Sequence, residues 1–309
     1  MLIVCLGFTA CETEITPLVE DSRPFTLYGY LNPTQNLQIL RVIPITQRID
    51  APVENPIDAV VTSTNLTNGQ VQPWRQESIL FSDSIMRPVF VGDFRAEHGH
   101  AYRLEVRRPD GAASSAEVVV PRDVHVTLQE EGRHFARPGF LIEGSESLNI
   151  VQADVEYATA SLFPPPHSPF LYLIPVSYRG LEERVDDVVS INLNLFEDFD
   201  AIQATHEAAC LNPEYISLRS ITFSLFIGDA GWQPPGGVFD PEVLVQPGQF
   251  SNVENGLGFV GAGFGQRFAI RRSSGQLEEV GYTFTGPCLN DPDPENNPAC
   301  QLVAPCLEF

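Results

Sequence analysis

The sequence predicts a mainly β fold, with two β-rich domains and one short helix. The 26 prolines and 23 glycines among 309 residues indicate many turns and few long helices. Short segments rich in β-branched and aromatic residues recur along the chain, several with polar–apolar alternation, and turn residues separate them. The length is sufficient for two domains, each with its own core.

Residues 25–121 have the pattern of the first domain. The segments "FTLYGYLN" (25–32) and "LQILRVIPIT" (37–46) are typical strands. Two further strand-like runs are joined through Asn68-Gly69, a strong short-range turn signal. The segment 97–121 predicts a hairpin, because apolar and charged residues alternate over 102–107 before a Pro-Asp-Gly turn at 109–111.

Gly99 precedes Tyr102, which opens the alternating strand. This arrangement resembles the tyrosine corner of immunoglobulin-like sandwiches, in which the ring packs inward and the hydroxyl bonds to nearby backbone. About seven short strands in this range suit that architecture. We therefore expect residues 25–121 to form an Ig-like β-sandwich.

Residues 122–309 predict a second β-rich domain. Long strand-like segments include "LYLIPVSYRG" (171–180) and "SLRSITFSLFIGD" (217–229). The segment "EDFDAIQATHEAACLN" (197–212) has apolar residues near helical spacing and predicts the one short helix. Local patterns do not define the topology of this domain.

The N-terminal segment indicates a lipid anchor. Residues 1–10 have the length and apolar character of a signal-peptide hydrophobic region, and "FTAC" resembles a bacterial lipobox with Cys11 as the acylated residue. Phe8 stands where leucine is usual, and no basic residue precedes the apolar run, which suggests a start codon further upstream. Residues 11–24 are acidic and predict a tether. The alternative is an ordinary cysteine in a buried first strand.

The charge is strongly negative, with 18 basic residues against 40 acidic ones and a net charge of −22. Such a field repels phosphate backbones, so we expect no nucleic-acid partner. It also repels anionic lipids, so membrane attachment needs a covalent or hydrophobic anchor. Adaptation to salty surroundings explains the acid excess better than codon bias, although both effects are compatible with an arginine-only basic set.

Two motifs suggest cofactor or metal sites at first sight. His98 and His100 form an H-x-H pair, but they flank a glycine in a predicted corner and a third ligand is not evident, so a solvated turn is favoured over a metal site. The segment 256–265 contains G-x-G-x-x-G, but the strand-like run after it is not the helix that dinucleotide binding requires. We interpret these glycines as a tight bend or a close backbone approach in a sheet, and expect no cofactor.

The mature chain would hold four cysteines beyond the lipid site, and export would place them under oxidising conditions. We expect a local Cys288–Cys300 disulfide and a long-range Cys210–Cys306 disulfide, with free thiols as the alternative. The absence of C-x-x-C pairs argues against zinc. The acidic run 291–297 lacks the central glycine and distal glutamate of a calcium loop, so a solvated loop is favoured.

The sequence contains no G-x-S-x-G, H-E-x-x-H or P-loop motif. Glu197, Asp198 and Asp200 could supply a carboxylate pair, but clusters of this kind arise by chance in so acidic a chain. We therefore expect a protein that is not an enzyme.

Three features together resemble an uncharacterised family of Bacteroidota lipoproteins, known only as a domain of unknown function. They are the cysteine before an acidic tether, the strand pair "HAYRLEVRRPDG…VVVP", and "SNVENGLGFVGA" (251–262), which is similar to the family's Ser-Asn-[IV]-x-x-Gly-x-Gly signature. Genes of this family often lie beside a TonB-dependent receptor, and the family has no established catalytic residues.

The resemblance implies an outer-membrane-anchored lipoprotein, facing the periplasm or the surface, with a binding or scaffolding role accessory to TonB-dependent uptake. The alternatives are a glycan-acting hydrolase on the same anchor and a purely structural surface protein.

Overall fold

The computed structural model of the chain describes residues 23–45, 56–81, 84–130, 134–144, 148–161, 171–208, 216–232 and 251–282. Within these ranges the protein is mainly β, which confirms the predicted fold class. Neither of the helices in these ranges is both long enough and apolar enough to cross a membrane.

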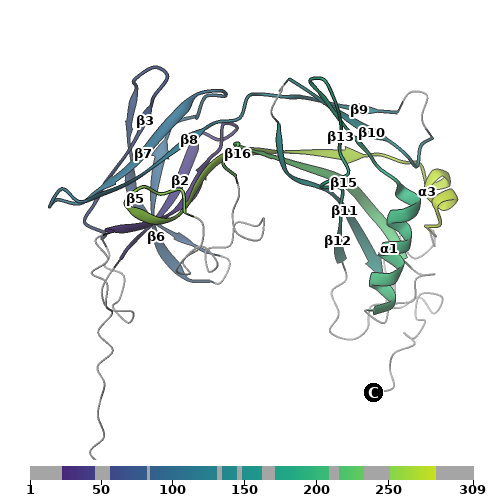
Figure 1. Cartoon of the computed structure of the whole chain (residues 1–309). Coiled ribbons are helices and arrows are strands. Elements are labelled where there is room, and N and C mark those ends of the chain that lie inside the picture. The colour runs from purple at the N-terminus through teal and green to yellow at the C-terminus, as the bar shows by residue number, and fades with distance from the viewer. Residues whose placement is uncertain are drawn as a thin grey trace, which may run out of the picture.

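One eight-stranded sheet runs through the whole molecule, and two four-stranded sheets pack against it (Figure 1). The order in the large sheet is β12 (Leu171–Ser177), β11 (Asn149–Ser161), β15 (Ile216–Gly228), β16 (Gly256–Ile270), β1 (Phe25–Leu31), β2 (Leu37–Pro44), β6 (Met86–Asp93) and β5 (Arg75–Leu80). The first small sheet contains β4 (Val71–Pro73), β3 (Val60–Asn65), β7 (Ala101–Arg107) and β8 (Ala113–Val119). The second contains β13 (Glu183–Val185), β14 (Val188–Asn192), β10 (Gly139–Glu143) and β9 (His125–Gln129).

Strand β16 belongs to both halves of the molecule. Its first part pairs in parallel with β1, and its second part pairs antiparallel with β15. Val260 and Ala262 enter the hydrophobic core of the first half, whereas Phe264 and Ile270 enter that of the second. Because alternate side chains of a strand share one face, both small sheets cover the same face of the large sheet. The molecule is therefore two β-sandwiches side by side, joined by one continuous strand.

The opposite face of the large sheet carries an aromatic cluster around Tyr28, Trp232 and Phe259. Glycines in β16 make room for it: a Cβ at Gly261 would lie 2.6 Å from a ring carbon of Trp232. Gly258 has a φ of +97°, and a Cβ there would overlap the carbonyl oxygen of the paired Leu27. The G-x-G-x-x-G segment thus lies within a strand, and the expected close backbone approach is confirmed.

The signature segment 251–262 closes the first sandwich. The side chain of Asn252 donates to the carbonyl of Val260 at 2.5 Å and accepts from its N–H at 3.0 Å. The Ser114 hydroxyl donates to the carbonyl of Asn255, and the Asn255 side chain donates to the carbonyl of Ala113, both at 2.7 Å. These bonds fasten β8 to the segment that leads into β16. The sandwich built mainly from residues 25–121 is therefore completed by residues from beyond 250.

The predicted turns and the tyrosine corner are confirmed. Gly69 and Gly111 adopt φ values of +77° and +91° in the β3–β4 and β7–β8 connections. The Tyr102 ring is buried, and its hydroxyl accepts a hydrogen bond from the Glu97 N–H at 2.9 Å. The hydroxyl thereby satisfies a backbone donor at the corner before β7.

The predicted helix is α1 (Leu195–Ala208), which begins two residues before the expected segment. Its buried polar residues Asp198 and His206 lie on one face with Ile202, at intervals of four residues. A second helix, α3 (Ser274–Val280), is not predicted by the sequence analysis. Its signal was the capping box formed by Ser273 and Gln276.

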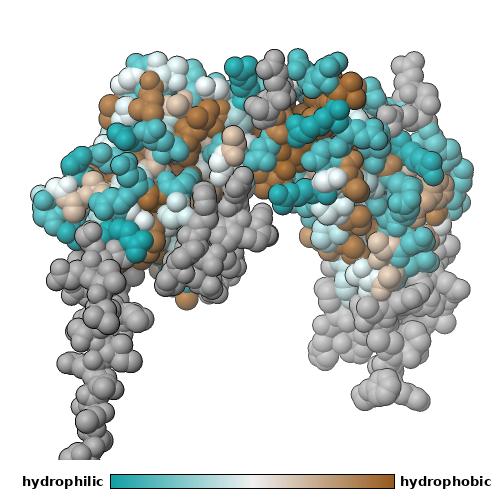
Figure 2. Space-filling view, viewed as in Figure 1, coloured by the Kyte–Doolittle hydropathy of each residue, from teal (hydrophilic) through white to brown (hydrophobic). Residues whose placement is uncertain are grey.

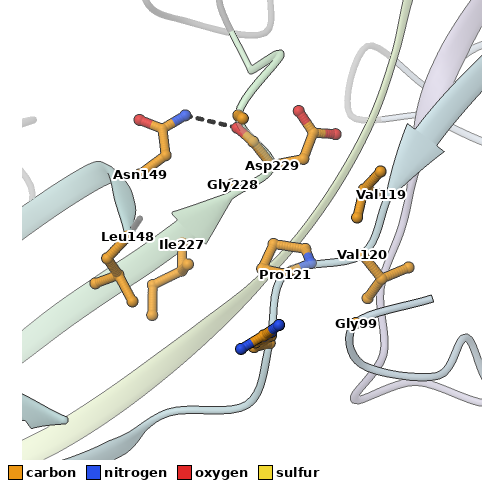
Figure 3. A pocket seen from close by; sticks show the side chains of 11 residues that line it. Gly99, Val119, Val120, Pro121, Leu148, Asn149, Ile227, Gly228 and Asp229 are labelled. Carbon is orange, nitrogen blue, oxygen red and sulfur yellow. Dashed lines mark hydrogen bonds between the residues drawn. The ribbon is translucent and has the colours of Figure 1, made fainter. Parts of the chain in front are cut away.

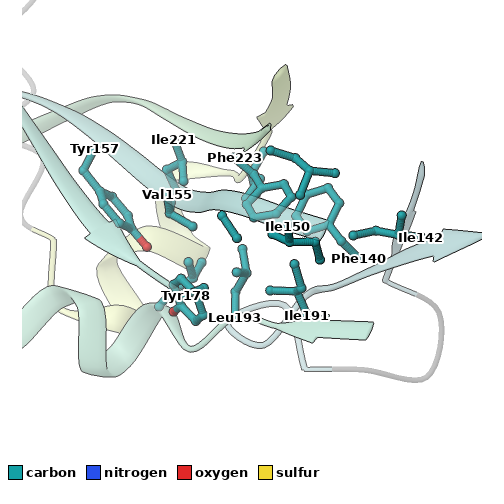
Figure 4. Close-up of a cluster of buried hydrophobic side chains, with 14 of the residues drawn as sticks. Phe140, Ile142, Ile150, Val155, Tyr157, Tyr178, Ile191, Leu193, Ile221 and Phe223 are labelled. Atoms are coloured by element: carbon teal, nitrogen blue, oxygen red, sulfur yellow. The ribbon is translucent and has the colours of Figure 1, made fainter. Parts of the chain in front are cut away.

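The core of the second sandwich is aromatic as well as aliphatic (Figure 4). Phe140 of β10 and Phe223 of β15 stack with ring centroids 4.1 Å apart. Tyr157 and Tyr178 lie at the end of this core that faces α1. The two sheets therefore pack face to face around this core, and α1 covers one end of it.

Candidate functional site: a cleft at the junction of the two sandwiches

A cleft of about 390 Å³ lies where the two sandwiches meet (Figure 3). The first sandwich contributes the end of β8 and the residues after it, from Val119 to Arg122. The second contributes Leu148 and Asn149 at the start of β11 and the end of β15, from Ile227 to Ala230. Figure 2 shows hydrophobic side chains at the surface near the middle of the molecule, between the two sandwiches. The cleft is large enough for a small ligand, and it lies at a domain junction, where binding sites are common.

Asp229 is the buried polar residue of this cleft. It follows directly after β15, and its N–H donates to the carbonyl of Ala262 at 2.8 Å. Its carboxylate accepts hydrogen bonds from the backbone N–H groups of Ala262, at 2.6 Å, Gly231 and Trp232. Burial raises the pKa of Asp229 to about 6, and the three backbone donors oppose this rise. The carboxylate thus holds the turn after β15 against β16.

Asn149 is bonded to Asp229 within the same wall of the cleft. Its side-chain amide donates to the carbonyl of Asp229 at 2.7 Å, the contact drawn as a dashed line in Figure 3. This bond ties the start of β11 to the turn after β15. The lining residues of the second sandwich are therefore held by hydrogen bonds, and the site is preformed.

His98 and His100 lie beside the first-sandwich wall, and they do not converge. The Nδ1 atom of His98 lies 2.8 Å from the carbonyl of Pro121, and its ring meets the Phe264 ring edge-on at 5.0 Å. His100 instead contacts the side chain of Asn65 at 2.9 Å. Among the described residues, no group of three His, Cys, Asp or Glu side chains is arranged to hold a metal ion. The H-x-H pair thus builds the corner and helps to join the two sandwiches.

The three acidic residues of the predicted helix, Glu197, Asp198 and Asp200, lie on different sides of α1. Asp198 is buried and accepts hydrogen bonds from the hydroxyls of Tyr157 and Tyr178, the latter at 2.8 Å. Glu197 and Asp200 are exposed on the other side of α1. Burial raises the pKa of Asp198, and the two hydroxyls oppose this rise. In Figure 4 the rings of Tyr157 and Tyr178 lie at the end of the core. This carboxylate therefore fastens α1 to the second sandwich.

The predicted lipid and disulfide residues lie outside the described residues. They are Cys11, Cys210, Cys288, Cys300 and Cys306, and the acidic loop 291–297 lies outside as well. These predictions stay untested.

Neither Asp229 nor Asn149 stands out in the sequence as a site residue. Asp229 follows a long predicted strand and precedes Ala-Gly-Trp, which is typical of a turn that ends a strand. That signal places a turn but does not indicate burial, because the burial depends on β16 lying beside it. The cleft is therefore a product of tertiary structure.

The chain matches no protein-family model, and none of the curated proteins compared with it is significantly similar. The resemblance to the Bacteroidota lipoprotein family stays a prediction.

Proposed function

We propose that this protein is an outer-membrane-anchored lipoprotein with a non-catalytic binding or scaffolding role, accessory to a TonB-dependent uptake system. Its lipid is carried on Cys11, and residues 11–24 tether the body to the membrane. One observation carries the binding role: a preformed cleft at the junction of two sandwiches that share a strand.

The lining of the junction cleft supports binding rather than chemistry. The lining residues are mostly apolar or glycine, with Arg122, Asn149 and Asp229 as the polar side chains. Glycoside hydrolysis would need two carboxyl groups roughly 5–10 Å apart. Asp229 is the one carboxylate among the described lining residues, and three backbone N–H groups already occupy it. This arrangement favours the binding protein over the lipid-anchored glycan hydrolase.

The shared strand supports a rigid binding surface. Because β16 continues without interruption from the first sandwich into the second, rotation of one against the other would break its ladder to β1 or to β15. Ordering of the site on binding therefore costs little, which favours affinity.

The net charge supports the need for an anchor. A chain of net charge −22 is repelled by anionic lipid headgroups. Two or three acyl chains, at about 0.8 kcal/mol per buried methylene, would hold it at the bilayer against this repulsion.

The test is affinity capture of the tagged protein from outer membranes of its own host in mild detergent, followed by mass spectrometry. We expect a TonB-dependent receptor to be captured with the wild-type protein. Intact-mass measurement should show acylation at Cys11, and Cys11→Ser should move the protein to the soluble fraction.

The cleft is tested in the same experiment with Val119→Trp, because Val119 lines the cleft and is 56% exposed. The matched control is Val60→Trp, at an exposed valine of β3 outside the cleft lining. We expect V119W to lose the captured partner and V60W to retain it. Capture that is equal for both variants would show that the cleft is not the binding site, and an unmodified Cys11 would refute the anchor.

A further inference from the structure

A second pocket, of about 370 Å³, lies at the other end of β15 from the junction cleft. It is formed by the first residues of β15, the end of β16 and Leu277 of α3. Its nine lining residues include Arg219, Arg271 and Arg272 and no carboxylate. The whole chain, with 18 basic and 40 acidic residues, is strongly negative. The lining of this pocket, with three arginines and no carboxylate, is positive. We call this site the arginine pocket.

Arg272 has an incomplete set of acceptors. Its side chain is only 3% exposed. Its Nε donates to the carbonyl of Phe135 at 2.9 Å, and its Nη1 donates to Glu130 at 2.5 Å and to the carbonyl of Arg271 at 2.7 Å. Its Nη2 is buried and has no acceptor within the described part of the chain. A buried cationic donor of this kind calls for an acceptor beyond those that the described residues supply.

Arg219 and Arg271 are exposed at the pocket, and neither side chain has an ion pair or hydrogen bond to the described residues. Exposed arginines elsewhere, such as Arg107 and Arg108, pair with carboxylates two residues away. Two guanidinium groups without a partner among the described residues therefore line the same pocket as a buried guanidinium that lacks one acceptor there.

We propose that the arginine pocket binds an oxyanion of the phosphate-ester or sulfate-ester type, carried by a ligand about the size of a sugar. Arg219 and Arg271 have planar, forked donors that match such an oxyanion, and the Ser220 hydroxyl supplies a further donor. Leu218 and Leu277 provide apolar contact for the carbon skeleton. The pocket volume exceeds that of the anion alone and lies within the range of small-molecule sites.

This site goes beyond the proposed function, since it needs neither the lipid nor the junction cleft. The same oxyanion chemistry occurs in phosphorylated and in sulfated sugars, so the test uses both. Calorimetric titration of the full chain with glucose 6-phosphate and glucose 6-sulfate should give a Kd of about 1 mM or tighter for at least one of them. Glucose should not bind, and the affinity for the ester should fall as NaCl is raised, because salt screens charge.

The test variant is Arg219→Gln combined with Arg271→Gln, since both residues are exposed and the fold should tolerate their loss. We expect the affinity for the ester to fall about tenfold or more. The matched control is Arg179→Gln, at an exposed arginine in the turn after β12 whose side chain likewise has no partner among the described residues. An unchanged urea midpoint confirms that each variant is folded.

The proposal would be overturned by no binding of either ester by the wild type, by unchanged affinity in the double variant, or by an equal loss in R179Q. Glucuronate is the comparison for charge alone. Binding of glucuronate as tight as that of the esters would refute the assignment to phosphate or sulfate. A failed capture of a receptor leaves these titrations unaffected, so the two proposals fail separately.

Discussion

Replacing Gly258 with alanine tests how closely β1 and β16 are held together. Gly258 is paired with Leu27, and its φ is +97°, where an L-residue costs about 1–2 kcal/mol. An added Cβ would overlap the Leu27 carbonyl oxygen and lie 3.1 Å from the Leu27 nitrogen. These are backbone atoms, so the strand itself must move. Relief of the overlap would break at least two ladder hydrogen bonds, at about 1 kcal/mol each, and would open the packing around them.

The expected total loss for G258A is therefore about 4 kcal/mol or more, which is large for a single substitution. Two other glycines provide matched controls. Gly69 has a φ of +77° with nothing within 4 Å of an added Cβ, so G69A should cost only about 1–2 kcal/mol from backbone strain. Gly275 lies in α3 with open space around it, so G275A should be neutral or stabilising by up to about 1 kcal/mol.

Urea unfolding followed by tryptophan fluorescence measures these differences on both faces of the large sheet. Trp74 belongs to the first core and Trp232 to the aromatic cluster on the opposite face of the large sheet. Measurements in Trp74→Phe and Trp232→Phe backgrounds therefore report the two regions separately. We expect G258A to lower both midpoints together. A loss in G258A within about 1 kcal/mol of that in G69A would refute the reasoning, because strain alone accounts for a loss of that size.

Three further predictions concern stability. Tyr102→Phe removes the acceptor of the part-buried Glu97 N–H and of the buried Asn65 side-chain amide, and should cost about 1–3 kcal/mol by urea unfolding; no loss would show that water replaces the hydroxyl. Asp198→Ala leaves two buried tyrosine hydroxyls without their acceptor and should cost about 2–5 kcal/mol, whereas Glu197→Ala on the exposed side should change stability by less than about 0.5 kcal/mol. Burial lowers the pKa of His206 from 6.5 to about 4, so the unfolded chain takes up this proton first as the pH falls. Its contribution to stability is present above pH 6.5 and is lost between pH 6.5 and 4, by at most about 3 kcal/mol. In His206→Gln, the free energy of unfolding should no longer show this decrease between pH 6.5 and 4. Identical pH profiles for variant and wild type would contradict the prediction.

Local sequence patterns predicted much of the fold because their causes are local. The alternation over 102–107, the Asn68-Gly69 turn and the Pro-Asp-Gly turn each depend on a few neighbouring residues, and the structure contains all of them. The same patterns could not predict the division of β16 between two sandwiches. One partner, β1, lies near the start of the chain, and the other, β15, lies close before β16. Periodicity contains no information on which strands pair.

The candidate sites were less predictable for the same reason. The burial of Asp229 depends on Ala262, and the acceptors of Arg272 come from Glu130 and Phe135, which lie more than a hundred residues earlier. Asp198 was noticed in the sequence as one of three neighbouring acids. Only the fold distinguishes it from the other two, because Tyr157 of β11 and Tyr178, directly after β12, both donate to it.

The pairing of β1 with β16 also constrains the order in which the protein is made. A ribosome that has finished β1 must add about 230 residues before the strand that covers its edge exists. At roughly 5–20 residues per second, this delay is about 10–50 s. During that time the apolar side chains of Phe25, Leu27 and Leu31 border an open sheet edge, a state prone to aggregation. The part synthesised first is therefore the part finished last, because its sheet is completed only after β16 has been made.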